Sequence, residues 1–252
     1  TQREWDVLAS EPHGIESSII YYPANTEIES YQGINTDITK KITLNVETIE
    51  PESLTGLLQN ITDIGAQNFP DIFRYWQQEI METQGSFGEF VSYFLNGQEN
   101  PTFPTLNSRL DESSVTLHRG TFNNISRNLN SALEFFDNRD ATTLDYEDIL
   151  YPGKMSIINV AGEKGIQFGS ILLRHLLKRI VMAKSQRIKN VPILVIIDEV
   201  HQFYNTESSR EALGDLDTIC RTGRSQEIGV IFASQNQKDI PKGLSNVINT
   251  KI

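Results

Sequence analysis

The sequence has 252 residues, a formal net charge of −11 and a single cysteine, Cys220. Its 38% hydrophobic and 22% charged residues are ordinary for a globular protein of one or two domains, and it holds neither an apolar run as long as a membrane span nor a signal-peptide pattern. The acidic balance excludes a DNA-binding module that works by bulk electrostatics, and the lone cysteine excludes a disulfide framework and fits a reducing cytoplasm.

Residues 1–50 contain two short runs of strand-forming residues. The first is 18–22 (Ser-Ile-Ile-Tyr-Tyr), which Pro23 closes, and the second is 41–46. We predict that 1–50 form the N-terminal part of an α/β core. Because the chain does not begin with Met and stops in mid-pattern at Ile252, we expect a fragment that lacks elements on both sides.

Residues 51–150 have a helical character. Apolar residues recur at helical spacing in its first part, and this stripe consists of Leu54, Leu57, Leu58, Ile61 and Ile64. Further helices are predicted at 69–81, 87–95 and 126–136. Prolines near residue 101 mark a break between them. We interpret 51–150 as a helical insertion whose aromatic residues form a core of their own; an element that faces a partner or DNA is the alternative.

Residues 151–252 alternate between strand and helix patterns. Predicted strands lie at 155–160, 193–197 and 228–233, and predicted helices at 168–184 and 208–221. Strand, helix, strand, helix, strand is the order of an open parallel sheet. Strands as continuously apolar as 193–197 are typical of a sheet covered on both faces. The fold class predicted for the chain is therefore α/β with a mainly parallel sheet and a helical insertion.

Two acidic residues follow the most apolar predicted strand. Ile193–Ile197 runs directly into Asp198 and Glu199, and open α/β sheets bind ligands at the carboxyl ends of their strands. A carboxylate at that edge can hold the water shell of Mg²⁺, which binds nucleotide phosphates through few protein ligands. The adjacent carboxylate can activate a water for attack on a γ-phosphate. We assign Asp198 to the metal and Glu199 to general-base catalysis, as in a Walker B motif; a strand that merely ends in an exposed acidic turn is the structural alternative.

Three more polar residues complete the candidate site. Gln235 follows the strand at 228–233, where its amide can orient the attacking water or detect the γ-phosphate. Arg221 and Arg224 lie between the two strands, and an arginine reaching the phosphates in cis or from a neighbouring subunit stabilises charge in phosphoryl transfer. A basic helix end terminated by Gly223 explains these arginines equally well.

A basic stretch and a missing motif also bear on function. Residues 164–189 contain seven cations, and the nearest acid is Glu163. The cations are Lys164, Arg174, Lys178, Arg179, Lys184, Arg187 and Lys189. We interpret them as a local basic surface, either solvated or in contact with a DNA backbone or an acidic neighbouring subunit.

The sequence contains no Gly-x-x-x-x-Gly-Lys-Ser/Thr phosphate-binding loop. We therefore expect the 252-residue fragment alone to bind nucleotide poorly and to be inactive.

These motifs together resemble the HerA–FtsK superfamily of DNA-pumping ATPases, and the HerA branch most closely. Residues 193–203 (Ile-Leu-Val-Ile-Ile-Asp-Glu-Val-His-Gln-Phe) resemble the Walker B segment, 221–224 the arginine-bearing helix end, and 233–235 the sensor strand. A shorter similarity covers Glu4-Trp5, which matches an acidic-aromatic pair that follows the phosphate loop in the family. Asn159 departs from the family, whose members often carry an acid there.

The resemblance implies a RecA-like P-loop ATPase core that binds ATP and Mg²⁺, a hexameric ring and double-stranded DNA in its channel. It further implies a nuclease partner and a role in processing DNA ends. Three alternatives stay open: a non-catalytic ATPase-like scaffold, a DEAH-type helicase, whose box is imitated by residues 198–201, and a DNA-transfer or packaging ATPase. The domain assignment that follows is 1–50 and 151–252 for the two parts of the core and 51–150 for the insertion.

Overall fold

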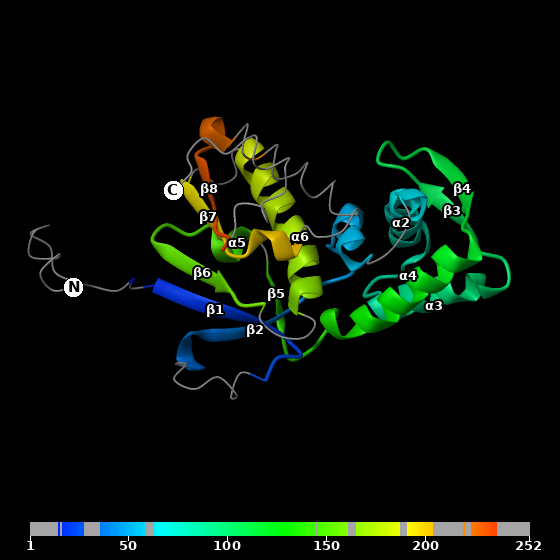
Figure 1. Ribbon diagram of the computed structural model, residues 1–252, viewed down its shortest axis with the longest axis horizontal. Helices are drawn as coiled ribbons and strands as arrows, with labels where there is room; N and C mark the ends of the chain where they lie inside the picture. The colour runs from blue at the N-terminus through cyan, green and yellow to red at the C-terminus, as the bar shows by residue number, and fades with distance from the viewer. Residues whose placement is uncertain are drawn as a thin grey trace, which may run out of the picture.

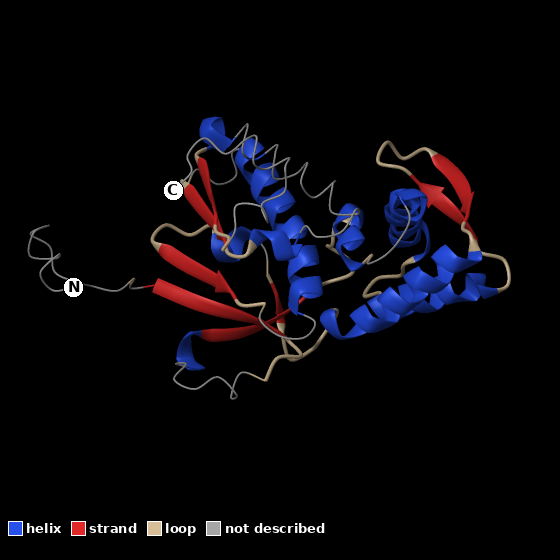
Figure 2. Cartoon of the chain, viewed as in Figure 1, coloured by secondary structure: helices blue, strands red, loops and turns tan. Residues whose placement is uncertain are grey.

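The computed structural model describes residues 15, 17–27, 36–58, 63–144, 146–160, 165–186, 191–203, 219 and 223–235. Its strands are β1 (Ser17–Pro23), β2 (Thr39–Thr43), β3 (Thr102–Leu106), β4 (Glu112–Thr116), β5 (Thr142–Thr143), β6 (Lys154–Ile158), β7 (Ile193–Ile197) and β8 (Ile228–Phe232). Its α-helices are α2 (Asp63–Tyr75), α3 (Phe87–Leu95), α4 (Arg119–Ala132), α5 (Tyr146–Ile149) and α6 (Gly165–Ser185). Shorter helical turns are η2 (Thr36–Ile38), η3 (Pro51–Leu57), η4 (Trp76–Ile80), η5 (Asn96–Gln98), η6 (Leu133–Phe135), η7 (Val200–Phe203) and η8 (Gly223–Gln226) (Figure 2).

The main sheet is parallel and has four strands in the order β5-β2-β1-β6. β1 lies in its centre, with Ile20 opposite Thr39 on one side and Ile157 on the other. The predicted α/β class with a mainly parallel sheet is confirmed at this level. The two-residue strand β5 joins this sheet from within residues 51–150.

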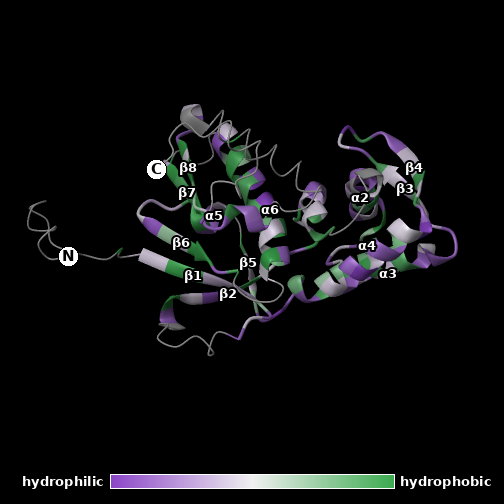
Figure 3. Cartoon of the chain, viewed as in Figure 1, coloured by the Kyte–Doolittle hydropathy of each residue, from purple (hydrophilic) through white to green (hydrophobic). Residues whose placement is uncertain are grey.

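β7 and β8 form a second, separate parallel pair in which Ile197 lies opposite Phe232. Within the described residues neither strand is hydrogen-bonded to β6, so the single continuous sheet expected from the strand–helix alternation is not what the structure shows. The expected coverage of both faces is also absent there, because Leu194 and Ile196 are each 61% exposed. Both strands are strongly apolar (Figure 3). An apolar run identifies a strand, but it does not specify the partner of each edge.

Helix α6 joins the two sheets (Figure 1). Phe168 and Ile171, in its first half, belong to the core beneath β1 and β2, whereas Leu177 and Ile180 belong to a smaller core with Ile197. Buried side chains of this helix include Ile171, Leu172, His175, Leu176 and Ile180. None of the described helices is long and apolar enough to cross a bilayer.

The helices predicted at 69–81 and 87–95 correspond to α2 with η4 and to α3, whereas α4 ends at Ala132 and the apolar stripe from Leu54 begins in the separate turn η3. Residues 51–150 also contain a hairpin that we did not predict. β3 and β4 pair antiparallel although Pro104 interrupts β3; a proline is tolerated where a strand has a free edge, and the described residues show β3 paired only with β4. Phe94 and Phe103 stack with ring centroids 4.8 Å apart, which fixes the hairpin against α3. The expectation of a separate aromatic core was wrong, because these rings are continuous with the core of the main sheet.

Asp137 fastens α3 to the end of β2. Its carboxylate accepts hydrogen bonds from the backbone N–H of Phe87 at 2.7 Å and of Val46 at 3.2 Å. Burial, together with the charges of Glu47 and Glu89, raises the pKa of Asp137 although these two hydrogen bonds lower it. Ser86 and Glu89 form a capping box that begins α3 at Phe87. The start of the helix is therefore fixed both locally and by a residue fifty positions away.

Candidate active site at the ends of β7 and β8

The two acidic residues of the Walker B-like motif lie in the turn between β7 and η7. Asp198 is exposed, and its Oδ1 accepts a hydrogen bond from the Glu199 backbone N–H at 3.0 Å. Glu199 is half-buried and has a φ of 47°, in the left-handed region that residues other than glycine rarely adopt. Such backbone strain costs about 1–3 kcal/mol and is concentrated at functional sites.

The end of β8 lies directly beside this turn. The Ala233 N–H donates to the Ile197 carbonyl at 2.9 Å, and the Val200 N–H donates back to the Ala233 carbonyl at 3.3 Å. Gln235 follows two residues later and is exposed. Asp198, Glu199 and Gln235 therefore lie at the carboxyl ends of neighbouring parallel strands, as the sequence predicted.

A histidine that the sequence analysis did not assign to the site contacts Glu199. His201 Nδ1 lies 3.3 Å from Glu199 Oε2, and the two side chains are 27% and 25% exposed. The only sequence signal for this contact was the likeness of residues 198–201 to a DEAH box. A spacing of two residues does not by itself bring side chains together; here the sharp turn at Glu199 does so.

The far side of the turn is closed by α6. A Cβ added at Gly169 would lie 2.9 Å from Phe203 Cε1 and 3.0 Å from Val160 Cγ1. Gly169 thus allows Phe203, the last residue of η7, to approach the helix backbone. Val200 is fully buried in the smaller core. The turn is held by packing from one side and by the backbone hydrogen bonds of β8 from the other.

The backbone of Arg224 is not at this edge. Arg221 lies outside the described residues. The backbone of Arg224 lies in η8, which precedes β8, and Gln226 of the same turn donates from Nε2 to Ser185 Oγ at 3.1 Å near the end of α6. Because β8 rises about 3.3 Å per residue over its length, Arg224 is at the opposite end of the strand pair from Asp198.

Two of the seven cations of the predicted basic surface are buried inside the protein. Arg174 is 5% exposed and donates to the Glu52 carbonyl at 2.7 Å and to the Thr55 hydroxyl. Lys184 is 8% exposed and donates to the Val191 carbonyl at 2.8 Å. The interpretation of Arg174 and Lys184 as surface cations was wrong, because hydrogen bonds to backbone carbonyls hold both side chains inside. Lys164, Arg187 and Lys189 lie outside the described residues.

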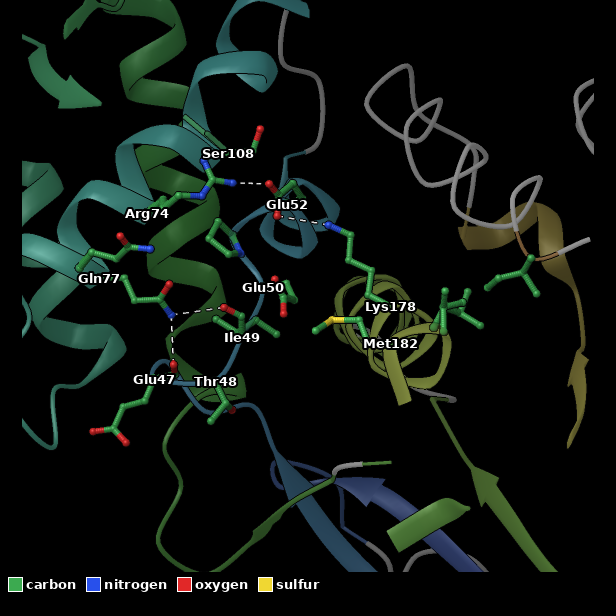
Figure 4. A pocket seen from close by; sticks show the side chains of 15 residues that line it. Glu47, Thr48, Ile49, Glu50, Glu52, Arg74, Gln77, Ser108, Lys178 and Met182 are labelled. Carbon is green, nitrogen blue, oxygen red and sulfur yellow. Dashed lines mark hydrogen bonds and ion pairs between the residues drawn. The ribbon is translucent and has the colours of Figure 1, made fainter. Parts of the chain in front are cut away.

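A cleft of about 570 Å³ lies between η3, α2 and α6 (Figure 4). Glu52 lies at its wall and forms ion pairs with Arg74 from α2 and with Lys178 from α6, the latter at 3.2 Å. Burial by itself raises the pKa of Glu52, but the charges of Lys178 and Arg74 and a backbone hydrogen bond together hold that pKa below its ordinary value. Asp198 and Glu199 do not line this cleft, so its polar groups serve to join α6 to α2.

The residues at the strand ends fit part of a Mg²⁺–nucleotide site. One exposed carboxylate, Asp198, suits a cation that keeps most of its water ligands. Among the described residues there is no cluster of three or more His, Cys, Asp or Glu side chains able to hold a metal. The chain offers carboxylates for the metal and for the water, but no phosphate-binding loop occurs in its sequence.

Comparison with known proteins gives a distant similarity. Over 118 residues the chain is 27% identical to a DNA double-strand break repair helicase HerA from Sulfurisphaera tokodaii. The match covers 45% of this chain and 24% of that protein. No protein-family model matches the chain. These findings support a distant HerA-like relationship.

Proposed function

We propose that the chain is part of an ATP-hydrolysing DNA translocase or helicase motor of HerA type. The observation that carries the proposal is the position of Asp198 and Glu199 at the carboxyl end of β7, beside the end of β8 that leads to Gln235. The similarity to a DNA repair helicase supports the same conclusion independently. The double-stranded DNA, the ring of subunits and a nuclease partner are parts of the proposal.

Each residue has a distinct role in the proposed site. Bound ATP with Mg²⁺ supplies the phosphoryl group and the charge that neutralises it. Asp198 accepts hydrogen bonds from water in the metal's shell. Glu199 accepts a proton from the attacking water, and Gln235 orients that water. Because Arg224 lies at the other end of β8, its role, with that of Arg221, is to reach the site of a neighbouring subunit.

A non-catalytic scaffold is the second candidate. It would be favoured by an upstream sequence that also lacks a phosphate-binding loop, since none occurs in these 252 residues. The presence of Asp198, Glu199 and Gln235 together at the ends of β7 and β8 argues against it.

The test is ATP turnover by the full-length protein, with and without duplex DNA, beside a Glu199→Gln variant. We expect turnover that DNA stimulates, with loss of at least about 100-fold in the variant and ATP binding retained. Absence of both nucleotide binding and turnover in the full-length protein would favour the scaffold. Turnover that Glu199→Gln leaves unchanged would remove Glu199 from the mechanism.

A further inference from the structure

The His201 imidazole faces the Glu199 carboxylate across the turn that follows β7. Its Nδ1 lies 3.3 Å from Glu199 Oε2. This nitrogen is buried, and it has no aligned hydrogen-bond partner within the described residues. A buried polar atom without a partner is unfavourable, so the nearby carboxylate is the acceptor that it needs. Hydrogen bonds between catalytic groups are often long before substrate binds and shorten afterwards.

We propose that His201 is a positioning residue for Glu199, an inference that rests on the proposed function. In its neutral form the imidazole donates from Nδ1–H to Glu199 Oε2. That hydrogen bond fixes the rotation of the carboxylate and leaves Oε1 to accept the proton of the attacking water. A histidine's tautomer is set by the hydrogen bond that each of its nitrogens makes, so Glu199 in turn holds His201 in the Nδ1–H form.

The backbone keeps the two side chains in register. Gln202 donates its N–H to the Glu199 carbonyl at 2.9 Å, which closes η7 around the pair. Val200, between them, is fully buried and is hydrogen-bonded to Ala233. The separation of Glu199 from His201 is therefore a property of a packed turn and does not depend on a surface loop.

The pair is suited to orientation more than to stability. Both side chains are about a quarter exposed, and partly exposed ion pairs contribute little to folding. Residues that orient a catalytic ligand, by contrast, typically change activity 10- to 100-fold when they are removed. A positioning role therefore predicts a loss of turnover with little loss of folding stability.

The test compares three variants of the full-length protein in DNA-stimulated ATP turnover. His201→Ala removes the donor, and we expect kcat to fall about 10- to 100-fold while the KM for ATP changes less than about twofold. His201→Asn carries an amide N–H where Nδ1 was, and we expect it to recover most of kcat. His201→Gln carries its amide farther out, and we expect it to remain as slow as His201→Ala.

A second measurement, by NMR, does not depend on ATP turnover. In the nucleotide-free protein, ¹⁵N NMR of labelled histidines should show His201, identified by its absence in His201→Asn, as the Nδ1–H tautomer. Glu199→Ala should shift it away from that form. A wild-type kcat in folded His201→Ala, or equal rates for the Asn and Gln variants, would overturn the positioning role while Glu199→Gln still tests the proposed function separately. An inactive wild-type protein would instead reject the proposed function and this inference with it.

Discussion

The backbone N–H of Val200 donates to the carbonyl of Ala233, 33 residues further along the chain, at a distance of 3.3 Å. This single hydrogen bond links the turn after β7 to the residue that follows β8. It keeps the acidic turn beside the strand end that leads to Gln235.

The strained backbone of Glu199 predicts a trade-off between stability and activity. Glycine adopts a φ of 47° without a steric penalty, so Glu199→Gly should raise the free energy of unfolding by about 1 kcal/mol. The same variant should lose turnover. Glu199→Gln is the matched control, because it keeps the Cβ and the strain and should leave the stability nearly unchanged. Denaturant unfolding measures the stability of each variant. Equal stabilities for Glu199→Gly and Glu199→Gln would contradict the idea that the Glu199 backbone is strained.

Gly169 predicts a packing effect on the acidic turn. In Gly169→Ala the new methyl group would lie 2.9 Å from Phe203 and 3.0 Å from Val160. We expect a net loss of about 1–2 kcal/mol of stability, because overpacking outweighs the better helix propensity of alanine. Gly88 lies in α3, and a Cβ added there would meet Ser86 Oγ only at 3.8 Å. Gly88→Ala should therefore stabilise the protein by about 0.5–1 kcal/mol. A stabilised Gly169→Ala protein would show that Phe203 is not held against α6.

Glu52 predicts a stability that depends on pH. Its pKa in the folded protein lies below its ordinary value, so the stabilisation is present at neutral pH and is lost as the pH falls from the ordinary pKa of about 4.5 through the lowered folded value. At pH 7 Glu52→Gln should cost about 1–2 kcal/mol, a figure reduced for the partial exposure of the pair. The difference from wild type should shrink at pH 3–4. Denaturant unfolding at pH 7 and at pH 3–4 measures the stability difference between wild type and Glu52→Gln. A difference that does not change with pH would exclude the charge of Glu52 as its cause. Glu50→Gln, in the wall of the same cleft, is the control.

The position of Arg224 predicts complementation between subunits if the proposed ring forms. Arg224→Ala should abolish turnover, as should Glu199→Gln. In a mixed ring, a site whose own subunit keeps Glu199 and whose neighbour keeps Arg224 is complete. Random mixing of equal amounts should make about one interface in four competent in a head-to-tail ring. Turnover assays of the mixture measure this, and no recovered activity at any ratio would contradict a role across the interface.

The structure also shows where sequence reasoning stops. β7 at 193–197 and α3 at 87–95 were predicted with their observed boundaries, because apolar runs, helical spacing and caps are local features. The hairpin formed by β3 and β4 was missed because its strands are stabilised by stacking of Phe103 on Phe94 of another element. Local patterns carry no record of such a contact.

The sequence by itself determined the α/β class, the strands β1, β2, β6, β7 and β8 and the acidic pair at the end of β7, since each depends on residues that are neighbours in the chain. Only the tertiary structure decided which cations stay at the surface, because Arg174 and Lys178 are drawn inward by the Glu52 region more than 120 residues away. It also decided that His201 meets Glu199 and that Arg224 lies at the far end of β8. These relationships depend on how elements pack and on one strained φ angle, and side-chain chemistry read along the chain does not specify either.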